Sequence, residues 1–337
     1  MPSSRVRPSL SSTLAGLCLI AAALALDARP VLAAKIKMVF PGPATTFSLP
    51  YFVARKQGWL GDLEVEDLHV TGDANAMRVL LSGNADIGLI GTLNVLASLH
   101  AGANIRAIHS WQPIGDYSLV LATGKGTKLA DLAGKTFASS GPGGLPDQLP
   151  RLIMRKYGID ETIARFVQVG GHAARLQAVI GGRADATLVN TVTALRGVQD
   201  GKVTVLTRLS AEFPGLGYVW NVVRTDSLDK LSAAFQTMTD IGIRGSRFVM
   251  EHPDEAAAIL HERLPELDVA FLKAVVRDLN GENVWGVNGG LDPAIEEFTA
   301  DLNVKLGNLP VAAPAKDVLE PRFVDRALAT LGNYPTK

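Results

Sequence analysis

Two glycine-containing connections hold the residues whose types could bind a ligand. Residues 139–144 read SSGPGG and lie between a predicted strand and a predicted helix. Residues 170–172 read GGH and occupy the same kind of position in the next connection. A glycine-rich turn before a helix presents backbone N–H groups and the positive end of the helix dipole, which suits an anion. The same pattern also fits an ordinary strand–helix connection, and this alternative stays open.

Four further side chains could add contacts to a ligand. His172 could donate a hydrogen bond, although a histidine at a helix start is at least as often a cap or a surface residue. Arg175 could neutralise an anion, but the sequence favours a solvated helix face for it. Trp111 and Trp220 fall near predicted strand ends or crossings, where an indole could stack on a ligand or pack in the core.

The sequence lacks the residue patterns that are typical of catalysis. It contains no Gly-x-Ser-x-Gly elbow, and the pair at 261–262, His-Glu, has no second histidine nearby. The six histidines show no metal-ligand spacing, and no acidic cluster resembles a calcium loop. Residues 139–144 are not a phosphate-binding P-loop, because no Gly-Lys-Ser/Thr follows. We therefore expect a binding protein without a metal or a cofactor, and not an enzyme.

The first 33 residues predict a cleavable secretory signal peptide. Arg5 and Arg7 precede an uncharged run over 14–26, which is shorter than the about 20 residues that cross a bilayer. Small residues up to Ala33 offer a cleavage site. Residues 34–337 then carry a slight net negative charge and no cysteine, because Cys18 lies in the signal. We expect a soluble periplasmic protein with no disulfide, no thiol chemistry and no binding to nucleic acid or to a membrane surface.

A short phrase occurs twice and marks two similar halves of the chain. Residues 81–89 read LSGNADIGL, and residues 180–188 read IGGRADATL. Each copy follows an apolar helical run, turns on a glycine and starts an apolar strand. Strands and helices alternate in a similar order around both copies, which is typical of parallel sheets covered by helices. Ligands bind at the carboxyl ends of such strands. In the first half these ends are 45–47, 71–73, 91–92 and 111–112.

The chain after residue 228 is predicted to be helical. Pro253, Pro293 and Pro321 stand at positions where helices often begin. An apolar strand over 218–224 would return the chain to the first lobe before these helices. The predicted organisation is a signal peptide at 1–33, a first lobe at 34–123 and 224–337, and a second lobe at 124–223 that includes the hinge crossings.

Four phrases, in order along the chain, resemble the periplasmic substrate-binding proteins of ABC importers in the nitrate, sulfonate and taurine group. They are PYFVARKQGW at 50–59, LSGNAD at 81–86, LADLAGKT at 129–136 and HPDEAA at 252–257. The resemblance implies a two-lobed periplasmic-binding-protein (type II) fold of the α/β class. Each lobe would be a helix-covered, mainly parallel sheet, with the ligand in the cleft between the lobes. It also implies hinge closure and docking of a monomer onto an importer permease with its ATPase.

In the family that this sequence resembles, ligand contacts come from the first loop, the end of the third strand and the loops that open the second lobe. The matching positions are Thr45, Thr46, Phe47, Thr92, Ser139, Ser140, Gly141, Gly171, His172 and Asn190. Trp111 and Trp220 complete the candidate set. Hydroxyls and backbone donors could hold a sulfonate or a carboxylate, while aromatic side chains could cover an apolar or aromatic body. We therefore expect a receptor that captures a small organic anion and delivers it to an ABC importer.

Three other interpretations stay open. The ligand could be a pyrimidine precursor of thiamine, because the same fold group includes eukaryotic enzymes that make this pyrimidine. Those enzymes carry a cysteine-rich motif, which residues 34–337 lack. A secreted enzyme could use the same cleft, but it would need a positioned acid–base pair. A sensor module that passes its ligand state to a membrane receptor would look the same in sequence.

Overall fold

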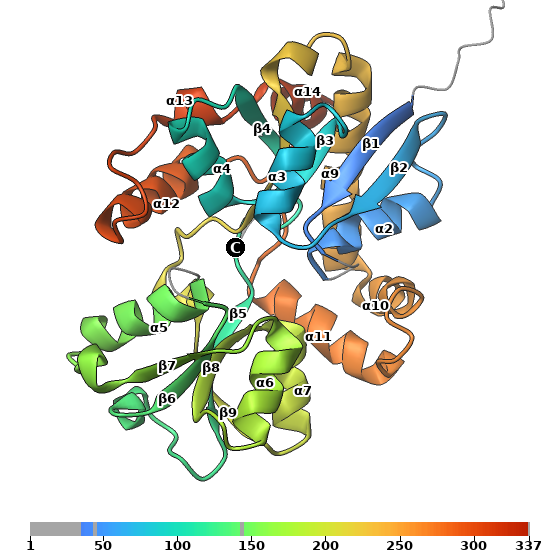
Figure 1. Ribbon diagram of the computed structural model, residues 1–337. Coiled ribbons are helices and arrows are strands. Elements are labelled where there is room, and N and C mark those ends of the chain that lie inside the picture. The colour runs from blue at the N-terminus through green and yellow to red at the C-terminus, as the bar shows by residue number, and fades with distance from the viewer. Residues whose placement is uncertain (1–34, 43–45, 142–144, 336–337) are drawn as a thin grey trace, which may run out of the picture.

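The computed structural model describes residues 35–42, 46–141 and 145–335. The predicted signal peptide, Thr45 and residues 142–144 lie outside the described residues. The described chain forms two α/β lobes, one above the other in Figure 1, which are joined by two crossing segments at 110–116 and 209–218. None of the helices in the described chain is long and apolar enough to cross a membrane.

The first lobe is built on a five-stranded sheet in the order β2-β1-β3-β10-β4. Its strands are β1 (Lys35–Phe40), β2 (Glu64–His69), β3 (Ile87–Gly91), β4 (Ile105–His109) and β10 (Val219–Arg224). Strand β1 runs parallel to β2 and β3, whereas β10 runs antiparallel to β3 and β4. The inner strands are apolar along nearly their whole length because helices cover both faces of the sheet.

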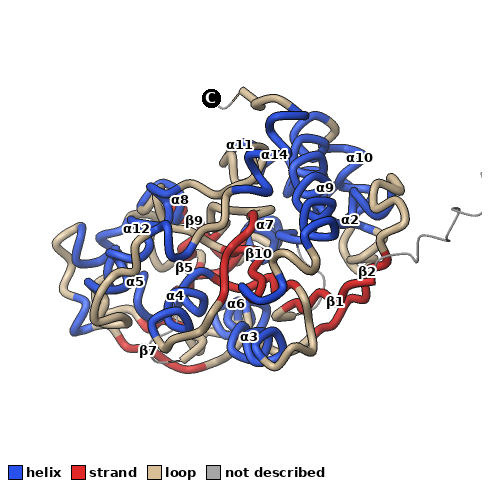
Figure 2. Tube along the Cα trace, turned by 90° about the horizontal axis from the view of Figure 1, so that it is seen from above, coloured by secondary structure: helices blue, strands red, loops and turns tan. Residues whose placement is uncertain are grey.

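Helices from both ends of the described chain pack around this sheet and on one another. The early ones are η1 (Thr46–Ser48), α2 (Leu49–Lys56), α3 (Asp73–Leu81) and α4 (Thr92–His100). The later ones are η4 (Thr225–Ser227), α9 (Ser232–Glu251), α10 (Pro253–His261), α11 (Val269–Gly281), α12 (Pro293–Lys305), α13 (Ala315–Val318) and α14 (Arg322–Leu331). Figure 2 shows α9 beside α2 and α10, at the far end of the molecule from α5. Gly245 permits this close packing, since a Cβ there would lie 2.2 Å from the Pro50 carbonyl oxygen.

The second lobe has its own five-stranded sheet, in the order β7-β6-β8-β5-β9. Its strands are β5 (Tyr117–Ala122), β6 (Thr136–Ser139), β7 (Arg165–Gln168), β8 (Ala186–Asn190) and β9 (Val203–Arg208). Its helices are η2 (Leu129–Leu132), α5 (Leu145–Lys156), η3 (Glu161–Ile163), α6 (His172–Ile180), α7 (Thr191–Gln199) and α8 (Leu209–Glu212). The two sheets therefore share one strand order, with a single antiparallel strand, β10 or β5, in the same place.

The strand pairing corrects the predicted lobe boundaries at 123/124 and 223/224. Strand β5, which was expected in the first lobe, pairs with β8 and β9 of the second sheet. Strand β10, which the predicted boundary counted with the hinge crossings of the second lobe, pairs in the first sheet, the lobe to which it was expected to return the chain. An apolar run records that a strand is buried but not which sheet it joins, so hydropathy alone could not place either strand.

The phrase that occurs twice has the same structural role in both lobes. Gly83 ends α3 with φ 76°, and Gly182 ends α6 with φ 73°, a conformation that glycine adopts without strain. The aspartate of each copy then holds the start of a neighbouring strand. Asp86 Oδ2 accepts a hydrogen bond from the Lys37 N–H at 2.8 Å, and Asp185 Oδ2 accepts one from the Thr136 N–H at 2.9 Å. The phrase therefore shapes the fold in both lobes.

All four tryptophans belong to the first lobe. Trp111 and Trp285 are buried in its main core cluster, and Trp59 packs against that cluster. Trp220 is buried in a second cluster of the same lobe. The indole of Trp111 stacks on the Tyr51 ring with the centroids 5.3 Å apart and the planes 5° from parallel. The alternative of core packing, which the sequence left open for Trp111 and Trp220, is therefore the one that the structure supports.

Candidate functional site

A line of aromatic rings runs from the first lobe through the second crossing to the second lobe. Phe47, in η1, meets Tyr218 of the second crossing edge-on with the centroids 6.1 Å apart. Tyr218 meets Tyr117, at the start of β5, edge-on at 5.5 Å. Tyr117 in turn stacks on the imidazole of His172 at 5.5 Å. The predicted site residues Phe47 and His172 thus belong to one continuous set of contacts between the lobes, which we call the aromatic line.

On the first-lobe side, Thr92 begins α4 and is almost completely buried. Its hydroxyl donates to the Gly217 carbonyl at 2.8 Å, and its N–H donates to the Tyr218 carbonyl at 3.0 Å. Thr46 is also buried, at the start of η1. Thr92 therefore holds the second crossing against the first lobe, and its hydroxyl is engaged. Thr45 lies outside the described residues.

On the second-lobe side, Ser139 ends β6 and is buried, while Ser140 is exposed. Gly141 is buried with φ 138°, and a Cβ at this position would lie 3.2 Å from Gln168 Nε2. This position therefore requires glycine. The anion-binding loop expected at 139–144 is tested only up to Gly141, because residues 142–144 are not among those described.

The loops that open α6 and α7 meet at His172. Gly171 is the N-cap position of α6, whose first residue is His172. The Asn190 side chain accepts a hydrogen bond from the Thr193 N–H at 3.2 Å and so caps α7. The Asn190 N–H donates to His172 Nδ1 at 3.0 Å. The predicted residues Gly171, His172 and Asn190 are therefore brought together, with two helix N-termini beside them.

Arg175, which lies directly behind this point, was not among the predicted site residues. The side chain was expected on a solvated face, but the residue is only 2% exposed. Its guanidinium donates to the Gly170 carbonyl and to the Leu188 carbonyl, the latter at 3.0 Å, and Nη2 lies 3.2 Å from His172 Nδ1. Arg175 stands one turn before Ala178 and Val179, which are buried on the same helix, and this spacing is the signal that could have identified it.

Arg175 supplies a positive charge that no acidic residue neutralises. Among the described residues, no carboxylate lies within ion-pair distance of its guanidinium, and its Nε has no hydrogen-bond partner. Arginine keeps its proton in proteins. A buried charge normally has an oppositely charged partner, because the loss of hydration is costly. The second-lobe side of the site therefore combines an unpaired cation with the N-terminus of α6, whereas the Thr191 N–H at the start of α7 donates to the Asp116 carboxylate at 3.4 Å.

The other ionisable groups near the aromatic line include one carboxyl on the second-lobe side. Asp116, which precedes Tyr117, accepts a hydrogen bond from the Thr191 N–H of α7 at 3.4 Å, and burial raises its pKa to about 6. Burial, and then the Arg175 charge, lowers the pKa of His172 to about 3. Burial raises the pKa of Tyr117 to about 12 and that of Tyr218 well above its ordinary value. Asp73, which accepts the Gly91 N–H at 2.7 Å, has its pKa raised by burial. Arg175 is therefore the cation on the second-lobe side of the site, and Asp116 is the carboxyl at the start of α7.

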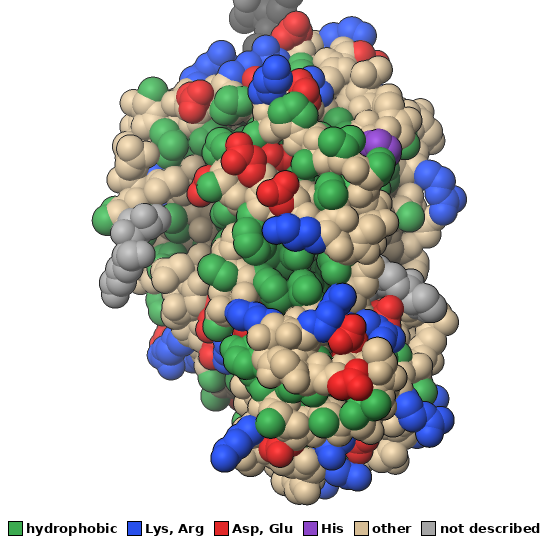
Figure 3. Space-filling model, turned by 90° about the vertical axis from the view of Figure 1, so that its left-hand side faces the viewer, with side chains coloured by type: hydrophobic (Ala, Val, Ile, Leu, Met, Phe, Trp, Pro, Cys, Tyr) green, Lys and Arg blue, Asp and Glu red, His purple; other side chains and the backbone are tan. Residues whose placement is uncertain are grey.

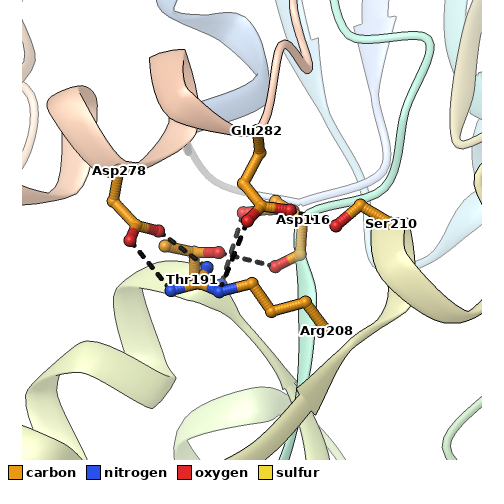
Figure 4. Close-up of polar contacts among 6 residues, drawn as sticks. All are labelled: Asp116, Thr191, Arg208, Ser210, Asp278 and Glu282. Atoms are coloured by element: carbon orange, nitrogen blue, oxygen red, sulfur yellow. Dashed lines mark hydrogen bonds and ion pairs between the residues drawn. The ribbon is translucent and has the colours of Figure 1, made fainter.

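Behind the site, a cluster of charges joins the lobes. Arg208, the last residue of β9, forms a bidentate ion pair with Asp278 of α11, with N–O distances of 2.7 and 2.8 Å (Figure 4). Glu282 lies 3.5 Å from Arg208 Nε and accepts a hydrogen bond from the Ser210 hydroxyl. On the other side of the lobe junction, the side-chain amides of Gln148 and Asn308 exchange hydrogen bonds of 2.8 and 3.0 Å. The helices after β10 therefore contact both lobes.

The surface is hollowed between the lobes. On the face in Figure 3, hydrophobic side chains gather in this hollow and basic side chains stand at its lower edge. Trp111 and Trp220 do not line it, since they are 0% and 1% exposed. This burial places both indoles in the core of the first lobe and gives no support to their prediction as ligand-stacking residues.

Residues 45–256 match the model of the NMT1/THI5-like family. The chain belongs to this family.

A comparison with curated protein sequences finds no match. Solved structures with the same fold include three binding proteins. The aliphatic sulphonate-binding protein SsuA from Escherichia coli has 15% identity and a TM-score of 0.67, covering 85% of this chain and 92% of its own. The periplasmic nitrate-binding protein NrtA from Synechocystis PCC 6803 has 16% identity and a TM-score of 0.70, covering 89% of each chain. A ligand-binding component of an ABC-type import system from Staphylococcus aureus has 17% identity and a TM-score of 0.70, covering 87% and 99%.

These similarities confirm the predicted type II periplasmic-binding-protein fold and the predicted resemblance to the sulfonate and nitrate group. The two five-stranded sheets are mixed, each with one strand antiparallel to its neighbours, as the mainly parallel pattern predicted.

Proposed function

We propose that this protein is a solute-binding protein that captures a small organic anion, a sulfonate or a carboxylate, between its lobes. The observation that carries the proposal is the buried, unpaired guanidinium of Arg175 behind the N-terminus of α6. A cation without a carboxylate partner and a helix N-terminus both favour an anionic oxygen group.

The aromatic line supports an organic ligand over a bare inorganic anion. Phe47, Tyr117 and Tyr218 lie next to His172 and offer ring faces and edges to an apolar or aromatic body. Binding pockets commonly combine such apolar surface with a few polar groups that fix orientation. Two of the structural neighbours are named as binding sulphonate or nitrate and the third as the ligand-binding component of an importer, and these names agree with an anion-binding role.

Delivery of the ligand to an ABC importer completes the proposed role. The predicted signal peptide at 1–33 would export the chain to the periplasm, where the two lobes would close on the ligand and dock on a permease with its ATPase. Sequencing the amino terminus of the exported protein tests this step. A mature chain that starts near residue 34 supports it, and an uncleaved chain held in the membrane contradicts it.

A thermal-shift screen of residues 34–337 tests the ligand class. The ligands are alkyl sulfonates, aromatic carboxylates, nitrate and pyrimidines, and stabilisation should grow as RT ln(1 + [L]/Kd). We expect the organic anions to stabilise the protein and to be recovered unchanged. Stabilisation by a neutral pyrimidine alone would contradict the anion proposal and support the thiamine-precursor alternative, for which the aromatic line also offers stacking surface.

Three variants locate the binding site. His172→Ala and Arg175→Met should weaken the binding of the best anion at least about tenfold, the loss that about 1.4 kcal/mol corresponds to. Arg183→Met is the matched control, because Arg183 is an exposed arginine in the same lobe, just after α6. Unchanged affinity in both site variants, with normal circular dichroism, would remove the second-lobe loops from the site.

A further inference from the structure

The imidazole of His172 receives two hydrogen-bond donors on the same nitrogen. The Asn190 N–H points to Nδ1 at 3.0 Å, and Arg175 Nη2 lies 3.2 Å from the same atom. A backbone amide and a guanidinium can only donate. Nη2 carries two hydrogens, so it can serve the Leu188 carbonyl at 3.0 Å and His172 Nδ1 together.

This arrangement decides where the proton of the ring resides. A nitrogen that accepts hydrogen bonds must offer its lone pair, so Nδ1 carries no proton and Nε2 carries one. Among the described residues, Nε2 has no hydrogen-bond partner, whereas Nδ1 has both. The ring therefore has one free polar atom, and that atom is a donor.

The groups around the ring do not favour an imidazolium. The nearest carboxyls, Asp116 and Asp73, act on Tyr117 and Tyr218, and burial raises the pKa of both, that of Asp116 to about 6. Arg175 faces it from its own helix, Tyr117 stacks on it from β5, and Tyr218 touches Tyr117 from the second crossing. No carboxylate of the described residues forms an ion pair with His172. Burial and the neighbouring guanidinium lower the pKa of His172 to about 3, in agreement with this geometry.

We propose that Arg175 is a positioning residue that fixes His172 as the neutral Nε2–H tautomer, so that the site presents a hydrogen-bond donor at this point. The second part rests on the proposed function: a ligand that reaches Nε2 must offer a hydrogen-bond acceptor there, such as an ionised sulfonate or carboxylate oxygen. Arg175 then supplies the positive charge that favours an anion, and His172 supplies the hydrogen-bond donor that orients it.

This division of roles gives the site a defined response to pH. A histidine that supplied positive charge itself would lose affinity for an anion as pH rises through the ordinary imidazole range near 6.5. A neutral donor backed by an arginine does not titrate in that range. Asp116, whose pKa burial raises to about 6, is removed from the test by an Asp116→Asn background. In that background we expect the affinity for a permanently ionised probe, methanesulfonate or benzenesulfonate, to change less than about twofold between about pH 5.5 and 8.

Nitrogen-15 NMR of the histidine rings in ligand-free residues 34–337 tests the tautomer directly. Long-range proton–nitrogen spectra distinguish a protonated ring nitrogen from a lone-pair nitrogen, and the His172→Gln variant assigns the signal. We expect a lone-pair Nδ1, a protonated Nε2 and no titration between about pH 5 and 8. The Arg175→Met variant should show a mixture of tautomers and a titration midpoint at least about one pH unit higher.

Arg175→Lys is the second variant, since a lysine keeps a charged donor if the methionine variant does not fold. It should leave Nδ1 as the acceptor. A protonated Nδ1 or an ordinary titration of His172 in the wild type would overturn the proposal, and so would a folded Arg175→Met variant with an unchanged ring. Because the spectra need no ligand, they stand even if the thermal-shift screen finds no anion. That outcome would overturn the proposed function alone.

Discussion

The ion pair between Arg208 and Asp278 should stabilise the junction of the lobes measurably. Arg208 ends β9 in the second lobe, while α11, which carries Asp278, packs on α10 and α9 of the first lobe. Replacing Arg208 with Met removes the only cation that ion-pairs with Asp278 and Glu282 among the described residues. The two carboxylates would then repel each other without compensation.

The geometry places the size of this effect between that of surface and buried ion pairs. The side chains of Arg208, Asp278 and Glu282 are 22%, 27% and 25% exposed. Two unit charges about 4 Å apart interact by about 4 kcal/mol at an effective dielectric constant of about 20. Desolvation and side-chain ordering offset most of this energy. We expect Asp278→Asn to cost about 1 kcal/mol, Arg208→Met about 2 kcal/mol, and the pair to have a coupling energy of about 1–2 kcal/mol.

A double-mutant cycle measured by urea unfolding, followed by far-ultraviolet circular dichroism, gives the coupling energy. The four proteins are the wild type, Arg208→Met, Asp278→Asn and the double variant, compared at equal m values. The matched control is a cycle on Lys56 and Glu262, which also pair at 2.7 Å but are 52% and 54% exposed. That exposed pair should show a coupling energy of about 0.5 kcal/mol or less.

The two coupling energies show whether burial at the lobe junction strengthens the ion pair. If the coupling energy of Arg208 and Asp278 is no larger than that of Lys56 and Glu262, burial at the lobe junction adds nothing to the pair. The reasoning from exposure and bidentate geometry would then be refuted. A change in m value for Arg208→Met alone would mean that the lobes no longer unfold together, which is a separate result.

Three further predictions concern the core of the first lobe. Glu296 is fully buried with both carboxylate oxygens unpartnered, and burial raises its pKa from 4.5 to about 7, so the fold loses stability as pH rises from about 4.5 to 7. In urea unfolding, Glu296→Gln should raise the free energy of unfolding at pH 8 by up to about 3 kcal/mol but not at pH 4, and an equal effect at both pH values would contradict this. Gly245→Ala should destabilise the protein by at least about 2 kcal/mol and lower its urea midpoint, because the alanine Cβ would overlap the Pro50 carbonyl between α9 and α2. An unchanged midpoint would show that these helices separate easily. Burial lowers the pKa of His109 to about 3, so below about pH 6.5 the unfolded chain takes up a proton that the native chain does not. His109→Gln should therefore reduce the fall in the free energy of unfolding between about pH 6 and 4 by up to about 1.4 kcal/mol per pH unit. An equal slope in the wild type and the variant would contradict this.

Short stretches of sequence were enough to predict the order of the strands and helices and the positions of the turns. Gly83 and Gly182 lie at positive φ where the repeated phrase predicted helix ends, and Asp86 and Asp185 make matching hydrogen bonds to backbone N–H groups. These features depend on a few adjacent residues and the strand beside them. The alternation of strands and helices followed from hydropathy and turn residues, which act over similarly short distances.

Short stretches of sequence could not predict which strands pair or which side chains meet across the fold. The apolar run of β5 does not say that it pairs with β8 and β9, since burial is the same in either sheet. The side chain of Arg175 is charged, and only the surrounding carbonyls and His172 explain its burial. The proximity of Phe47 and Tyr218 depends on the path of the second crossing, which no local pattern describes.

The placement of every tryptophan in the first lobe has a practical consequence for spectroscopy. Trp59, Trp111, Trp220 and Trp285 are the only indoles in the chain, so tryptophan emission reports the first lobe and leaves the second lobe optically silent. A fluorescence unfolding curve would therefore follow one lobe, while circular dichroism follows both. An indole introduced at Phe166, which stacks on Phe137 in the second lobe, would give that lobe its own emission and separate the two transitions.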